Sequence, residues 1–182
     1  MDLDFEKILE AAKLGQQWAF EKLYLQLSPA VVGYLRLQGS LDPEASTSDV
    51  FLGVFKGIKS FSGNESQFRS WVFTIAHHKL IDERRKPKLI EVGIDYEIIN
   101  NKSFEKTSED IAIENIGNKD LQKICQDLYA DQRDVILLRL LGGFTIEETA
   151  KTLNKTPGAV KSLQHRAIKA LKKKILRNAI SL

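Results

Sequence analysis

The sequence predicts an all-α protein made of two small helical domains joined by a flexible linker. Apolar residues recur at helical spacing along most of the 182 residues. Between residues 89 and 118 this period disappears, and acidic side chains gather there. We therefore expect an N-terminal helical bundle over 1–88, an acidic linker over 89–118, and a C-terminal helix-turn-helix domain over 119–182.

The first domain is predicted to contain consecutive helices. Phe5, Ile8, Leu9 and Ala12 lie on one face of a first helix that ends near Gly15. A second is expected to end at Ser28-Pro29, and a third to begin near Pro29. The pair Asp42-Pro43 resembles an N-cap followed by a first-turn proline, and it opens a helix that runs to about Lys59. A loop over 61–66 precedes a longer helix over about 67–86.

The segment from 87 to about 118 lacks helical periodicity. Residues 90–98 alternate between apolar and polar with a period of two, which is typical of a strand. A lone strand is not stable, so we interpret the segment as an extended linker. Helices over 119–128 and about 131–141 follow it, and Gly142-Gly143 ends the second.

The most informative run extends from Phe144 to Ala167. Thr145 and Glu148 have the spacing of a capping box, and Thr156 precedes Pro157 as a cap precedes a first-turn proline. No acidic residue follows Glu148, so the outer face of the second helix is cationic. Two short helices with this charge asymmetry fit the major groove of DNA. The alternative is an ordinary helical hairpin with a solvated lysine face.

Two other patches favour contact with a partner or with nucleic acid. Residues 50–55 carry apolar side chains around more than half of a helix, so this helix either meets another protein or lies at the centre of the bundle. The polar loop over 61–66 lies beside aromatic residues and cations, a combination suited to an unstacked base. Alternatively, Phe68 and Trp71 are structural, and the basic residues 84–86 offset the helix dipole.

Composition excludes several classes of protein. The net charge of +3 is mild, and its basic part is concentrated at the C-terminal end. Cys125 is the single cysteine, so no intrachain disulfide framework exists, and a buried apolar role is expected for it. The sequence shows no signal peptide, membrane-spanning stretch, metal cluster or catalytic constellation. We therefore expect a cytoplasmic protein with no enzymatic activity, no cofactor, no metal and no membrane insertion.

Three segments, in this order, resemble the extracytoplasmic-function sigma factors, the promoter-specificity subunits of bacterial RNA polymerase. Residues 47–52 resemble the family's polymerase-clamp helix, 68–85 its promoter-melting helix, and 157–167 its recognition helix for the upstream element. Three departures stand out. Ser46 replaces a usual apolar residue, Ser48 replaces a common Gln, and His77-His78 replaces a commoner Arg-Asn pair.

The resemblance implies three sets of contact residues, and partners for each. The β′ clamp of core RNA polymerase would be bound by Asp49, Val50, Phe51, Leu52, Val54 and Phe55. The melted −10 element of promoter DNA would be bound by Phe61, Ser62, Asn64, Ser66, His77, His78 and Arg85. The duplex −35 element would be read by Thr156, Lys161, Ser162, His165, Arg166 and Lys169. The polymerase β flap and an anti-sigma factor are further expected partners, and the linker is expected to mimic a transcript in the polymerase channel.

Two rival functions stay open at this stage. A stand-alone transcriptional regulator would use the helix-turn-helix on an operator and the apolar helix around Phe51 and Phe55 as a dimer face. An enzyme acting on nucleic acid would require an acidic or nucleophilic residue for its activity.

Overall fold

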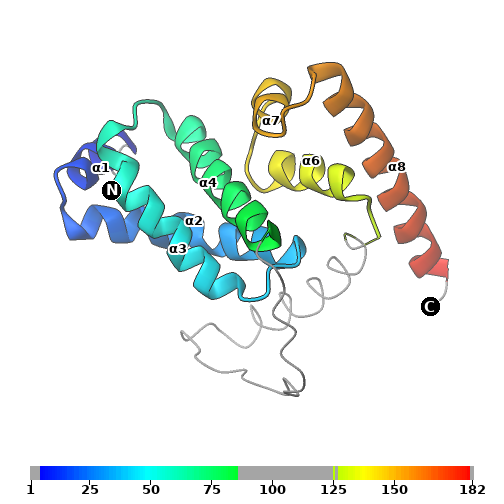
Figure 1. Ribbon diagram of the computed structural model, residues 1–182, viewed down its shortest axis with the longest axis horizontal. Helices are drawn as coiled ribbons and strands as arrows, with labels where there is room; N and C mark the ends of the chain where they lie inside the picture. The colour runs from blue at the N-terminus through cyan, green and yellow to red at the C-terminus, as the bar shows by residue number, and fades with distance from the viewer. Residues whose placement is uncertain (1–4, 86–124, 126, 181–182) are drawn as a thin grey trace, which may run out of the picture.

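The computed structural model describes residues 5–85, 125 and 127–180, with side chains through Lys173. Every regular element in these residues is helical, which confirms the predicted all-α fold (Figure 1). The predicted linker and most of the helix over 119–128 lie outside the described residues. The elements are α1 (Phe5–Lys13), α2 (Gln17–Leu37), α3 (Pro43–Gly57), the 3-10 turn η1 (Ile58–Ser60), α4 (Glu65–Arg85), α6 (Ala130–Leu140), α7 (Ile146–Thr152) and α8 (Pro157–Ile180).

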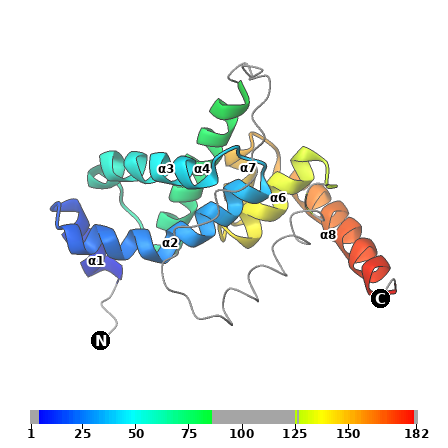
Figure 2. The ribbon, with the colours of Figure 1, turned by 90° about the horizontal axis from the view of Figure 1, so that it is seen from below.

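The helices form two groups. In the N-terminal half α2 packs against α1, α3 and α4, and α3 packs against α4. In the C-terminal half α6, α7 and α8 pack against one another. Both views place α4 at the border, next to α6 and α7 (Figures 1 and 2). Buried side chains of both halves, among them Phe73 and Ile136, belong to one continuous apolar cluster.

The prediction of a helix break at Pro29 is wrong. A single helix, α2, runs through this residue. An internal proline costs roughly 3 kcal/mol because one backbone hydrogen bond is lost. The buried side chains of Leu23, Leu27, Val31 and Leu35 continue as one stripe past the proline. Each such burial contributes roughly 1.5–3 kcal/mol, so packing outweighs the local penalty.

The predicted caps are confirmed. The Asp42 side chain accepts a hydrogen bond from the Ala45 amide at 2.9 Å. At α7 the Thr145 hydroxyl accepts from the Glu148 amide at 3.1 Å, and the Glu148 carboxylate accepts from the Thr145 amide at 2.7 Å. The Thr156 hydroxyl accepts from the Ala159 amide at 3.2 Å, so α8 begins where predicted.

The start of α4 carries a cap that the sequence reading missed. The Asn64 side chain accepts from the Gln67 amide at 2.9 Å, and the Gln67 side chain accepts from the Asn64 amide at 2.9 Å. This reciprocal pair moves the start of the helix to Glu65, two residues before the predicted position. It also fixes the exit angle of the 61–64 loop.

None of the helices in the described part of the chain has the length and apolar character that crossing a bilayer requires.

The capping box of α7 gives a test of local stability. Thr145→Ala removes the acceptor for the Glu148 amide and should lower the free energy of unfolding by about 1 kcal/mol. Thr152→Ala, in the last turn of α7, removes the same groups away from the cap and should change that free energy by less than about 0.5 kcal/mol. Urea titration measures both, and equal effects would contradict the role of the cap.

Candidate nucleic-acid and partner interface

The core of the helix-turn-helix determines which side of α8 faces outward. Val135 of α6, Ala150 of α7 and Val160 of α8 are buried together in a small apolar cluster. Ala167, two turns along α8 from Val160, is also fully buried. Arg139 of α6 holds the same inner side by donating to the Gln164 side chain at 3.2 Å. The opposite side is left exposed, and it carries Lys161, Ser162, His165, Arg166 and Lys169.

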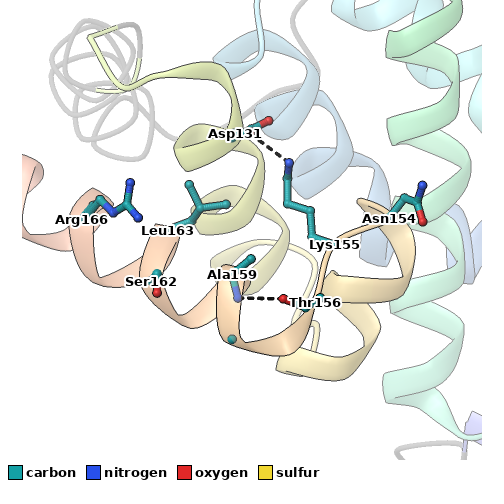
Figure 3. A pocket seen from close by; sticks show the side chains of 9 residues that line it. Asp131, Asn154, Lys155, Thr156, Ala159, Ser162, Leu163 and Arg166 are labelled. Atoms are coloured by element: carbon teal, nitrogen blue, oxygen red, sulfur yellow. Dashed lines mark hydrogen bonds and ion pairs between the residues drawn. The ribbon is translucent and has the colours of Figure 1, made fainter.

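A hollow of about 510 Å³ lies at the N-terminal end of α8. Thr156, Ser162 and Arg166, three of the six predicted −35 residues, line it (Figure 3). Three other polar residues, Asp131, Asn154 and Lys155, line it as well. Lys155, in the turn between α7 and α8, forms a 2.9 Å ion pair with Asp131 at the start of α6.

The sequence reading missed Asp131 and Lys155. Asp131 lies 24 positions before Lys155 in the chain, so only the packing of α6 brings the two together. The hollow therefore presents hydroxyl and guanidinium donors beside one carboxylate acceptor. These are the groups that read base edges and phosphates in a groove.

The 61–64 loop rests on an aromatic cluster. The Phe61 ring stacks on Trp71 with centroids 5.0 Å apart and meets Phe68 edge-on at 5.2 Å. Phe68 is buried, in agreement with the structural alternative. Trp71 is half-buried and lies so close to Gly57 that a Cβ there would be 2.9 Å from the indole ring. The polar side chains of the segment, Ser62, Asn64 and Ser66, are all exposed on the outside of this cluster.

The two adjacent histidines have opposite environments. His78 is exposed, as is Arg85 near the end of α4. His77 is only 3% exposed, and its Nδ1 lies 2.9 Å from the Tyr34 hydroxyl. Burial lowers the pKa of His77, an effect that the Asp134 carboxylate partly opposes. The assignment of His77 to the −10 contacts is corrected on this ground, because its ring is directed into the protein.

α3 has one buried side and one exposed side. Val50, Phe51 and Val54 are buried, and the Phe51 ring packs edge-on against Tyr24 at 4.7 Å. Their assignment to the clamp contact is corrected, because they form the core of the bundle. Leu52 and Phe55 are 57% and 55% exposed, so these two apolar side chains remain available to a partner. The central position in the bundle is thus confirmed for the three buried residues, and contact of Leu52 and Phe55 with another protein stays a prediction.

The exposed side of α3 also carries Asp49, whose carboxylate pairs with Lys79 of α4.

On the other side of the same helix, a buried serine forms a hydrogen bond with an acidic residue. Ser46 is 5% exposed and donates to Glu83 of α4, which also accepts from the Ser40 hydroxyl at 2.9 Å. This network explains how a polar residue is accommodated where the family usually has an apolar one.

No group of three potential metal ligands occurs within the described residues. The only cysteine, Cys125, is buried, and burial raises the pKa of its thiol. Its environment is that of a packed apolar side chain.

Comparison with known proteins identifies the family. A family model for "Sigma-70 region 2" matches residues 23–89, and one for "Sigma-70, region 4" matches residues 119–171. The chain belongs to the extracytoplasmic-function group of the sigma-70 family. It is 30% identical over 167 residues to the extracytoplasmic-function sigma factor BldN of Streptomyces coelicolor, covering 91% of this chain and 63% of BldN. Family membership suggests a non-enzymatic protein.

Two further sigma factors are similar to this chain, and the matched shares show how much of their length it spans. It is 30% identical over 129 residues to SigX of Bacillus subtilis, covering 69% of this chain and 66% of SigX. It therefore spans less than two thirds of both BldN and SigX. SigD of Mycobacterium tuberculosis is 26% identical over 177 residues, covering 94% of this chain and 84% of SigD.

A solved structure of CnrH in complex with the cytosolic domain of CnrY shares the fold. The TM-score is 0.63 at 21% identity, and the match covers 92% of this chain and 94% of that one.

The buried His77 makes stability depend on pH. Its pKa lies below 6.5 in the folded protein, so unfolding takes up a proton at acidic pH. The neutral His77 ring therefore makes its full contribution to stability above pH 6.5. This contribution is lost as the pH falls from 6.5 through the lowered pKa of His77. Urea unfolding at pH 7.5 and at lower pH should detect this loss. His77→Asn should flatten the profile, and a profile insensitive to His77→Asn would contradict this assignment.

Proposed function

We propose that this chain is a promoter-recognition subunit of bacterial RNA polymerase, of the extracytoplasmic-function type. The proposal rests on the presence of a region 2 match followed by a region 4 match, in the order that the family has. The last helix of the region 4 match exposes basic side chains and no acidic ones. In this proposal the chain performs no catalysis itself and directs the polymerase to DNA. We expect it in the cytoplasm, where that polymerase acts.

The −35 element is proposed to bind along the exposed side of α8. Arg166 and Ser162 line the hollow where α8 begins, and Lys161, His165 and Lys169 continue the exposed side. A recognition helix in the major groove contacts base edges through residues at its N-terminal end. Cations farther along the helix neutralise phosphates and contribute affinity that is independent of sequence.

The −10 element is proposed to contact the 61–66 segment. Ser62, Asn64 and Ser66 offer hydrogen-bonding groups just outside the aromatic cluster, and His78 and Arg85 are exposed on the helix that follows. Extruding one base costs a few kcal/mol, which contacts to its edge and to nearby phosphates can offset. Strand opening would thus be driven by binding.

Core polymerase is proposed to bind the exposed side of α3. Leu52 and Phe55 lie three positions apart, so they share one helix face as an apolar pair that nothing in the described chain covers fully. The β′ clamp is the partner that the family resemblance predicts for this helix, and the β flap the one that it predicts for the second domain. An anti-sigma factor stays a prediction from the same resemblance.

The remaining rival is a stand-alone regulator that dimerises through the same apolar pair. The two functions can be distinguished experimentally, because a stand-alone regulator binds DNA tightly as a dimer in the absence of polymerase. Co-sedimentation of the purified chain with core polymerase separates the two. A monomer that associates with polymerase supports the proposal, and an operator-binding dimer with no such association refutes it.

Arg166→Ala tests the −35 surface. Loss of a guanidinium that reads base edges should cost about 1–3 kcal/mol of binding to the preferred upstream element and relax the preference at that position. Lys173→Ala, on the same helix and also exposed, should weaken binding to all sequences alike. Selection from a randomised duplex library by the holoenzyme measures both, and an unchanged preference in Arg166→Ala would exclude this side of α8.

Phe55→Asp tests the polymerase surface. A carboxylate in the centre of an apolar interface should reduce affinity for core polymerase at least about 30-fold, or about 2 kcal/mol. Leu25→Asp, at another exposed leucine of the same bundle, is the matched control and should bind normally. If Phe55→Asp stays folded and still assembles with polymerase, α3 is not the contact.

A further inference from the structure

The hollow where α8 begins contains one carboxylate among cations. Of the described residues that line it, Asp131 alone is acidic, whereas Lys155 and Arg166 are basic. The Asp131 carboxylate lies 2.9 Å from the Lys155 Nζ, so an ion pair joins the start of α6 to the turn before α8 (Figure 3). The positive charge of this turn is therefore offset by a negative charge from another helix.

The two partners of this ion pair differ in their exposure to solvent. The side chain of Asp131 is 58% exposed, and that of Lys155 is 26% exposed. A duplex that approaches the hollow therefore meets the carboxylate more readily than the ammonium group. At this point its phosphates meet no net positive charge, although the exposed side of α8 is cationic.

Stability does not account for the ion pair. Exposed ion pairs contribute little to the free energy of unfolding, because water screens both charges. Asp131 lies in the first turn of α6, where a negative charge interacts favourably with the helix dipole. Neither effect requires a lysine 24 positions farther along the chain. What distinguishes the pair is its place, at the edge of the side of α8 that is proposed to face DNA.

A lysine without a partner in this turn would bind any duplex. Each phosphate that a lysine neutralises releases counterions, and the gain in affinity is the same for every base sequence. Lys155 is engaged with Asp131 instead. A phosphate that displaced the carboxylate from Lys155 would leave this carboxylate unpaired close by, and the two like charges would repel. The pair therefore reduces the affinity for phosphates and leaves Ser162 and Arg166 free to contact bases.

We infer that Asp131 is a positioning residue, which holds Lys155 away from DNA phosphates and so weakens the binding of the chain to DNA of any sequence. A genome offers a large excess of non-specific sites, so weaker binding to them leaves more of the chain available to core polymerase. The inference rests on the proposed function, because it requires that this side of α8 faces duplex DNA. Asp131 acts through Lys155 and contacts no base itself.

Asp131→Asn tests the inference with the full chain and a short duplex of random sequence. Fluorescence anisotropy gives the dissociation constant at a series of salt concentrations. The substitution frees Lys155 to bind one phosphate, so the slope of log affinity against log salt concentration should steepen by about 0.9. At about 0.15 M salt this change corresponds to about fivefold tighter binding. An unchanged slope would overturn the inference.

Glu10→Gln is the matched control. Glu10 pairs with Lys13 on α1 at 2.8 Å, and the exposure of the two partners is similar to that of Asp131 and Lys155. Both substitutions remove one negative charge and one exposed ion pair. Because α1 and α8 lie at opposite ends of the molecule (Figures 1 and 2), Glu10→Gln should leave the slope unchanged. Equal effects of the two substitutions would show that net charge alone is responsible, and would overturn the role of Asp131.

A Lys155→Ala background shows whether Asp131 acts through this lysine. Without the ammonium group there is no cation to release, so Asp131→Asn should then change the slope far less than it does in the natural chain. A full effect in this background would mean that the carboxylate repels DNA directly, which would overturn the role of the ion pair.

Selection from a randomised duplex library by the full chain tests whether Asp131 reads a base. Asp131→Asn should leave the selected sequences unchanged. A preference for cytosine or adenine that is lost at one position would show that the carboxylate accepts a hydrogen bond from a base amine, and would overturn the inference.

Co-sedimentation with core polymerase separates this inference from the proposed function. If the slope steepens in Asp131→Asn but the chain does not associate with polymerase, the inference stands and the proposed function fails. If the chain associates with polymerase while Asp131→Asn leaves the slope unchanged, the proposed function stands and the inference fails. A chain with no measurable affinity for duplex DNA, with or without the substitution, would also overturn the inference.

Discussion

The position of α4 between the two halves is the constraint on which the rest of the structure depends. Its first turn is capped by Asn64, which orients the polar loop, and Phe68 anchors the aromatic cluster beneath that loop. Farther along, Arg69 reaches the C-terminal half and His77 is buried against Tyr34. One helix therefore sets the presentation of the loop, the buried polar contacts and the attachment of the second domain.

Burial divides both α3 and α8 into a structural side and an exposed side that is proposed to bind. On α3 the residues that resemble the clamp motif include both core and surface side chains, and only Leu52 and Phe55 are exposed apolar groups. On α8 the division is clearer, because Val160 and Ala167 are fully buried while the cations between them are exposed. Consecutive residues of a sequence motif lie on both sides of the helix, and only the packing shows which of them are buried.

Helix caps were predictable because the hydrogen bonds that form them join residues close together in the sequence. The capping box at Thr145 and the cap at Asp42 depend on residues within one turn, and the structure confirms both. The break predicted at Pro29 fails because burial on either side of it outweighs a local cost. The burial of His77 and the contact between Asp131 and Lys155 join distant parts of the chain, and nothing in their immediate sequence indicates them.

The most direct test of the account is run-off transcription with core RNA polymerase on a library of genomic fragments, with and without the purified chain. If the chain is a promoter-recognition subunit, transcripts should appear only when it is present, from start sites that share two upstream elements. A chain that binds duplex DNA by itself but adds no start sites to those of core polymerase would contradict it.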